Sequence, residues 1–262
     1  MNVWEHLKEL VSARELLLAI AARSVQVRYK QSFLGIAWAI MQPLAQMLVF
    51  TLVFSWFAKV PSEGIPYPIF AYSALLPWSF FASSISTAAS SIVGNASLIT
   101  KVRLPTEVFP FGAVLARGVD LAIASLIFLA MMVIYQVPPT LHLLWLFPLL
   151  LIQVLLTMAI GLFLSAIDVF YRDIDFAVGL VMQLWMYISP VAYPVSLVPE
   201  PYQGLYMLNP MVPIIDGYRR AILHATPPDW IRLAWVTVAT LLFLILAYWF
   251  FKAQEREFAD VV

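Results

Sequence analysis

The chain alternates long apolar runs that carry no charge with short polar segments, and this pattern predicts membrane-spanning helices. A helix needs about 20 apolar residues to cross the hydrocarbon core of a bilayer. The third and fourth predicted helices share one stretch between Asp120 and Asp168, divided at Gln136, Pro138 and Pro139, because proline ends a helix. The runs predict six spans, at about 34–58, 69–92, 108–135, 143–167, 176–197 and 233–251. The expected fold class is therefore an all-α integral membrane protein.

The N-terminal segment mixes apolar and basic residues in a way that differs from the spans. Between residues 11 and 30, leucine, isoleucine and valine interleave with Arg14, Arg23, Arg28 and Lys30. This predicts an amphipathic helix that lies on the inner leaflet with a basic end. A basic flank that only fixes the topology is the alternative. The expected parts of the chain are a cytoplasmic N-terminal segment at 1–30, a transmembrane domain at 31–255 and a cytoplasmic tail at 256–262.

Lysine and arginine are unevenly distributed between the two sides of the predicted bundle. Cytoplasmic loops of membrane proteins are enriched in these residues. With the N-terminus inside, ten of them fall on the cytoplasmic side and four on the other, with Arg117 left in or beside the third span. The distribution predicts that both termini are cytoplasmic, which agrees with an even number of spans.

The connection at 94–107, with the sequence GNASLITKVRLPTE, carries apolar and basic side chains close together. A short helix that presents both kinds of group to the cytoplasm is suited to docking on a partner. An ordinary solvated loop fits these residues equally well. The residues of the predicted contact are Leu98, Ile99, Lys101, Val102, Arg103 and Glu107.

The external segment at 199–229 is rich in proline and yet apolar, as in LYMLNPMVPII. Backbone at membrane depth must be helical or shielded by protein. The segment therefore predicts two short re-entrant helices that dip back into the outer leaflet and are broken near Asn209 and Pro210. A cap on the external surface is the alternative.

The composition supports the membrane assignment and excludes several function classes. Apolar residues make up 63 % of the chain and charged residues 11 %, whereas soluble domains carry about 25 % charged residues. Formal net charge is zero, so no basic field attracts nucleic acid. The chain has no cysteine, which excludes disulfides, thiolate metal sites and cysteine nucleophiles.

No catalytic constellation is present in the sequence. The three histidines, His6, His142 and His224, lie in different segments, and no nucleotide-binding motif occurs. We therefore expect a transport subunit that is not an enzyme and binds no metal or cofactor itself. Any ATP, with its magnesium, would be bound by another polypeptide.

Two kinds of residue inside the membrane are candidates for function. Arg117 and Asp120 are three residues apart on one helical face, so they form either a substrate or gating contact or a structural ion pair. Aromatic residues make up 15 % of the chain. Most suit an interfacial belt, and the alternative is a channel lining that slides along sugar rings. The channel candidates are Trp38, Trp78, Phe81, Trp185, Tyr187 and Tyr193.

Six short motifs in order give the chain a family resemblance from about residue 28 to residue 258. They are RYKQSFLGIAWAIMQPL at 28–44, LLPWSFF at 75–81, NASLITKVRLPTEVFP at 95–110, FYRDID at 170–175, SPVAYP at 189–194 and LNPM at 208–211. With six predicted helices between them, the chain resembles the membrane subunit (permease) of type-2 ABC transporters that export bacterial surface polysaccharides. These include the exporters of O-antigen, capsule and teichoic acid.

The resemblance implies features that the residue pattern does not show. It implies a homodimer in the bacterial inner membrane, in which each copy pairs with a cytoplasmic ABC ATPase subunit. The segment matching 95–107 would be a coupling helix in the ATPase, and the segment between the last two spans would form external gate helices. The transported molecule would be a polysaccharide linked to undecaprenyl diphosphate. Arg23, Arg28 and Lys30 are the candidates for meeting that diphosphate at the inner leaflet.

Type-2 exporters of small drugs or lipids share the six-helix plan and are the alternative. They often carry a large external domain, and none is present in this sequence. The motifs do not identify the polymer.

Overall fold

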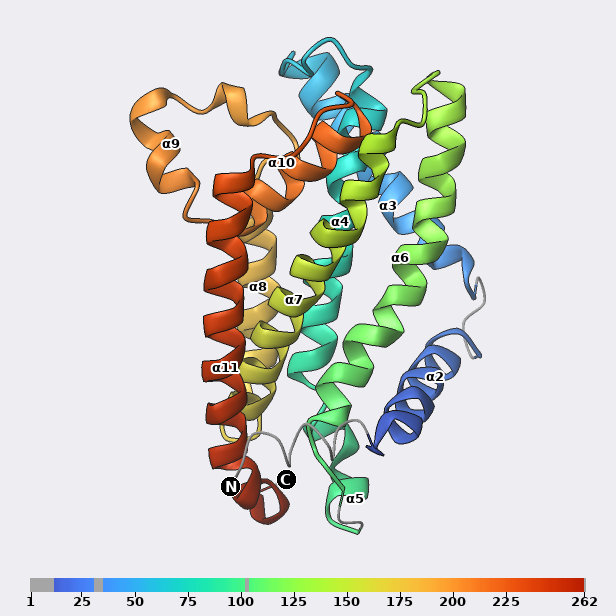
Figure 1. Cartoon of the computed structure of the whole chain (residues 1–262). Helices are drawn as coiled ribbons and strands as arrows, with labels where there is room; N and C mark the ends of the chain where they lie inside the picture. The colour runs from blue at the N-terminus through green and yellow to red at the C-terminus, as the bar shows by residue number, and fades with distance from the viewer. Residues whose placement is uncertain (1–11, 31–34, 102–103, 262) are drawn as a thin grey trace.

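The computed structural model describes residues 12–30, 35–101 and 104–261, and the regular structure in these residues is helical throughout (Figure 1). Five helical stretches are long and apolar enough to cross a membrane. They are α3 (Ala37–Phe50) with the π-helix η1 (Thr51–Phe57), α4 (Tyr67–Ala89), α6 (Val108–Ile134), the 3₁₀-helix η3 (Leu141–Trp145) with α7 (Leu146–Asp168), and most of α11 (Trp230–Val261). The prediction of an all-α fold with long apolar helices is confirmed for the described residues.

The predicted fifth span is shorter than its apolar run. α8 (Asp173–Ile188) has 16 residues, which corresponds to about 24 Å of helix, against a hydrocarbon core of about 30 Å. The helix ends at Ser189, whose backbone is extended, because the residue before a proline, here Pro190, disfavours the helical conformation. The predicted boundary at residue 197 is therefore wrong by nine residues.

α4 lies at the centre of the bundle. Of its apolar window, 72 % is buried, against 17–33 % for the other four candidate spans. It contacts α3, α6, α7, α8 and α10. The approach to α7 is close, because a Cβ added to Gly161 would lie 2.7 Å from the Cβ of Ala88. The remaining long helices keep wide apolar surfaces exposed, as expected for helices that face lipid or other subunits.

The two ends of the bundle carry different short elements (Figure 1). At one end, called here the α5 end, lie η2 (Val93–Asn95), α5 (Ala96–Ile99) and the last turns of α11. At the opposite end, the α9 end, lie η4 (Val195–Leu197), α9 (Glu200–Tyr206) and α10 (Met211–Ile222). Residues 207–210 separate α9 from α10, at the position where Asn209 and Pro210 predict a break.

The helix predicted at 11–30 is present as α2 (Arg14–Lys30). It packs on α6 toward the α5 end of the bundle (Figure 1). A Cβ added to Gly112 of α6 would lie 3.0 Å from the Cγ2 of Ile20, so the two helices approach closely there. Leu16, Leu17 and Ile20 are partly buried against the core. These three side chains are therefore used for packing within the protomer, whereas Leu18 and Val27 on the same helix are exposed.

Candidate functional site

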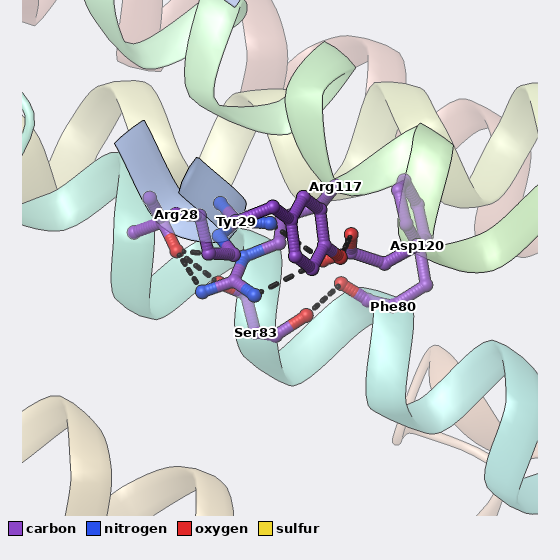
Figure 2. A network of polar contacts seen from close by, with 7 residues as sticks. Arg28, Tyr29, Phe80, Ser83, Arg117 and Asp120 are labelled. Atoms are coloured by element: carbon purple, nitrogen blue, oxygen red, sulfur yellow. Dashed lines mark hydrogen bonds and ion pairs between the residues drawn. The ribbon is translucent and has the colours of Figure 1, made fainter. Parts of the chain in front are cut away.

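Five polar residues from α2, α4 and α6 converge into one network, called here the arginine cluster: Arg28, Tyr29, Thr87, Arg117 and Asp120. Asp120 Oδ2 accepts hydrogen bonds from Arg28 Nη1 at 2.6 Å and from Arg117 Nη1 at 3.1 Å. Tyr29 donates its hydroxyl hydrogen to Asp120 Oδ1. Figure 2 shows Arg28, Tyr29 and Arg117 turned toward this carboxylate. Arg117 also donates to Thr87 Oγ1 from Nε at 2.9 Å and from Nη2 at 2.8 Å.

The arginine cluster carries an excess of positive charge. Two guanidinium groups share one carboxylate, and the three charged side chains are only 19–25 % exposed. Burial, followed by the hydrogen bond to Asp120, raises the pKa of Tyr29, so the phenol stays protonated and donates. A partly desolvated cation in excess is suited to receive an anion, because charge-assisted hydrogen bonds strengthen away from water.

A cavity of about 400 Å³ borders the arginine cluster. Residues of α2, α3, α4, α6 and α8 line it. Besides the charged groups of the cluster, its wall presents amides, hydroxyls and indole rings, from Trp38, Gln42, Gln46, Trp78, Ser79, Ser83 and Ser86. Guanidinium groups bind phosphate, amides and hydroxyls bind sugar hydroxyls, and flat aromatic rings contact sugar faces.

The structure separates the three basic residues of α2 that the sequence groups together. Arg28 points into the arginine cluster, whereas Arg23 and Lys30 are exposed. Residues 23 and 28 do not share a helical face. At 3.6 residues per turn, five positions correspond to about 500° of rotation, so the two side chains point about 140° apart. Of the predicted diphosphate contacts, only Arg28 therefore borders the cavity.

The aromatic channel candidates fall into two groups. Phe81 is fully buried and Trp78 is 3 % exposed. Phe81 packs against Trp78 and Trp185 with ring centroids 5.6 Å and 5.3 Å apart. Because α4 is the central helix, Phe81 and Trp78 are core residues of this protomer.

The other four aromatic candidates are at least partly exposed, with Trp185 partly buried against Phe81. Trp38 and Tyr187 are about half exposed, and Trp38 lines the cavity. Tyr193 is partly buried and donates to the backbone oxygen of Tyr187 at 3.0 Å. These three side chains keep the exposure that contact with a passing polymer requires.

The predicted coupling segment is only partly exposed at the α5 end. Leu98 and Ile99 pack against a cluster that contains Phe251 and Phe258 of α11, whereas Lys101 is exposed. Val102 and Arg103 lie outside the described residues. Glu107 is fully buried, and its carboxylate binds Lys252 Nζ at 2.7 Å. An internal ion pair therefore occupies the carboxylate of this predicted contact residue.

Arg219 of α10 lies in the external segment that the sequence predicts to be re-entrant, and it is buried. It is 3 % exposed, and its guanidinium lies 3.8 Å from the ring centroid of Phe70. It donates to the backbone oxygens of Val191 at 2.8 Å and Tyr193 at 3.0 Å. Burial lowers the pKa of Arg219 to about 10, which leaves it protonated at neutral pH. Arg219 thus holds the chain after α8 against α4 and α10.

A helical-face argument would have found this arginine. Val212, Ile215, Arg219 and Ile222 are spaced three to four residues apart, so they share one face of α10. The three apolar members are all buried. An arginine in that row is therefore an indication of a buried polar anchor.

Asn209, between α9 and α10, also contacts the end of α8. Its Oδ1 accepts from Trp185 Nε1 at 2.9 Å and from the Met211 backbone N–H at 3.0 Å. Its Nδ2 donates to Ser189 Oγ at 2.9 Å. One side chain thus links the end of α8 to the start of α10, which explains why the break between α9 and α10 falls there.

The sequence of the chain is similar to those of known membrane transport proteins. The family described as ABC-2 type transporter matches residues 15–223. The chain is 33 % identical to the O-antigen export system permease protein RfbA of Myxococcus xanthus, over 97 % of this chain and 98 % of that protein. It is 29 % identical to the RfbA of Klebsiella pneumoniae, over 95 % of both chains. The identity to the polysialic acid transport protein KpsM of Escherichia coli is 22 %, over 91 % and 93 %.

Proposed function

This chain belongs to the ABC-2 type transporter family, and from that premise we propose that it is the membrane subunit of an ATP-driven exporter of a cell-surface polysaccharide. The observation that carries the proposal is the match, over nine-tenths or more of each chain, to permeases whose names state export of O-antigen or transport of polysialic acid. The chain has no nucleotide-binding motif, so a separate cytoplasmic ABC ATPase supplies the energy. The permease itself performs no hydrolysis.

We propose that two copies form the conducting unit in the bacterial inner membrane, each with six spans and cytoplasmic termini. The five long helices and α8 supply the six crossings. Because α8 is short, either the bilayer is locally thinner there or the residues flanking α8 complete the crossing. Phe176, Leu180 and Leu184 of α8 are 83 %, 59 % and 53 % exposed. Such a row of apolar side chains on a short helix fits burial against the second copy.

We propose that the cavity beside the arginine cluster receives the diphosphate of an undecaprenyl-linked polymer from the inner leaflet. Arg28 and Arg117 would bind the phosphate oxygens, and Asp120 would hold both cations in place while the cavity is empty. Trp38, Tyr187 and Tyr193 would contact the sugars as the polymer moves. The excess positive charge of the cluster and the amides, hydroxyls and indole rings in the cavity wall support this assignment.

We propose that Lys101, with Arg103, contacts the ATPase at the α5 end, while α9 and α10 close the external side between strokes. The exposure of Lys101 supports the first assignment. The position of α9 and α10 at the opposite end of the bundle supports the second (Figure 1).

The proposed function is tested by export in cells that lack the chromosomal copy of this gene. The wild-type chain should restore surface polymer, and the ATPase expressed without it should not. The double variant Lys101→Glu with Arg103→Glu should leave permease in the membrane and abolish export. Purified complex whose ATPase responds to small drugs or lipids, and not to lipid-linked glycan, would replace this proposal by a drug or lipid exporter.

A further inference from the structure

The junction between the coupling segment and α6 is tied to the far end of the chain. Lys252 of α11 bridges two carboxylates, with Nζ 2.7 Å from Glu107 Oε2 and 2.8 Å from Glu255 Oε2. Glu255 Oε1 in turn accepts the Thr106 backbone N–H at 3.1 Å and the Thr106 hydroxyl at 2.7 Å. The bonds from Lys252 to Glu107 and from Thr106 to Glu255 join residues that are more than 140 positions apart in the sequence.

The network follows one face of α11. Tyr248, Lys252 and Glu255 are spaced four and three residues apart, so their side chains lie one above another. All three reach Thr106 or Glu107, with the Tyr248 hydroxyl 3.4 Å from Glu107 Oε1. Glu107 is fully buried, and Lys252 is only 15 % exposed. A charged pair so far removed from water persists only with its partners in place.

Apolar contacts strengthen the same junction. Phe251 and Phe258, seven residues apart on α11, are fully buried, with ring centroids 5.2 Å apart. They belong to one cluster with Val108 and Phe109 at the start of α6, and Leu98 and Ile99 of the coupling segment pack against this cluster. The segment is therefore attached to α11 both by charge and by packing.

We propose that Lys252 is a positioning residue that makes the coupling segment and the α5-end turns of α11 one mechanical unit. The inference rests on the proposed function, in which the ATPase acts on the coupling segment. A displacement of that segment then moves α11 as well as α6, into which the segment leads. Glu107 directly precedes α6 and lies ten positions before Arg117, about 15 Å along the helix. The same displacement therefore reaches the arginine cluster through α6.

The test uses the complete complex of permease and ATPase in proteoliposomes, with export and ATP hydrolysis measured together. Glu107→Gln combined with Lys252→Met removes the ion pair without leaving Glu107 as a buried charge, while Glu255, whose side chain is 25 % exposed, keeps its hydrogen bonds from Thr106. We expect assembly and basal hydrolysis to persist, while polymer exported per ATP falls about tenfold, as for loss of one coupling interaction. The single variant Lys252→Arg, with Glu107 intact, should keep most of the coupling of the wild-type protein. Arg256→Met, which removes an exposed charge from the same turns of α11, should leave the coupling unchanged.

A second measurement does not depend on how well the double variant folds. The chain has no cysteine, so Thr100→Cys and Arg256→Cys place two spin labels at exposed positions in the otherwise native permease. Doubly labelled permease is diluted with unlabelled permease, so that the measured distance lies within one protomer. The distance between the two labels is then measured without nucleotide and with trapped ATP. An unchanged distance distribution supports the single unit.

Two results would overturn the inference: normal export per ATP in the double variant, or label distances that shift between nucleotide states. Failure of the wild-type complex to export polymer would instead refute the proposed function. The label distances would still decide whether the coupling segment and α11 move as one unit.

Discussion

At the scale of single residues, the arginine cluster is the most informative feature of the molecule. The spacing of Arg117 and Asp120 predicts their proximity, but nothing in the sequence predicts that Arg28, about 90 positions earlier, joins the same carboxylate. That contact depends on how α2 packs on α6, which is a tertiary property. The result is a site with one positive charge in excess beside a cavity whose wall carries amides, hydroxyls and indole rings.

Arg28 and Arg23 provide a matched pair for testing this site. Arg28→Gln should lower surface polymer about tenfold, because it removes a charge-assisted contact to an anionic ligand. Arg23→Gln, on the same helix but exposed, should stay within about twofold of wild type, as is typical for a peripheral charge. Surface polymer is measured by immunoblot against permease level in the membrane fraction. Equal losses in both variants would show that α2 acts only through its net basic charge.

Arg219 and Arg220 are neighbours in sequence, but replacing each by glutamine should change the stability of the fold by different amounts. Arg219→Gln removes the guanidinium that donates to the buried backbone oxygen of Val191 and to the partly buried one of Tyr193. It should destabilise the fold by about 1–3 kcal/mol. Arg220 is 41 % exposed and pairs with Asp216 on the same helix, so Arg220→Gln should cost less than about 1 kcal/mol. Thermal denaturation in detergent measures both, and a larger loss for Arg220→Gln would contradict the assigned burial.

At the scale of elements, apolar runs predict where spanning helices exist better than where they end. The runs at 108–135 and 69–92 correspond to α6 (Val108–Ile134) and α4 (Tyr67–Ala89). The run at 176–197 fails because its apolar character continues after the helix stops before Pro190. Hydrophobicity reports the surroundings of a segment, whereas the helix boundary follows from backbone geometry.

The contact between α4 and α7 gives a prediction at the same scale. Gly161→Ala should destabilise the protein by about 1–3 kcal/mol, because the new Cβ would lie 2.7 Å from that of Ala88 and overpack the core. Gly118→Ala in α6 is the control, since nothing lies within 4 Å of its added Cβ. In a helix this control should be neutral or stabilising by up to about 1 kcal/mol. Thermal denaturation that ranks the two variants the other way would refute the close approach.

At the scale of the whole molecule, the sequence predicts the fold class, the helical plan and the family, but leaves the internal roles of residues open. Phe81 and Glu107 illustrate the reason. Each has the residue type expected for a channel or a docking surface, and each is buried by a helix from a distant part of the chain. Which face of α4 or which end of α11 is covered depends on packing that no local pattern encodes.

The predicted orientation is a property of the whole bundle and can be tested on it directly. The excess of lysine and arginine in the loops on the side of the N-terminus predicts that the α5 end is cytoplasmic and the α9 end external. Because the native chain has no cysteine, Thr100→Cys and Glu200→Cys, both at exposed positions, each carry a single reactive thiol. In spheroplasts, a membrane-impermeant maleimide should label position 200 and spare position 100, while permeabilised cells should label both. Labelling of position 100 alone in intact spheroplasts would invert the topology and, with it, the assignment of the arginine cluster to the leaflet from which substrate is taken.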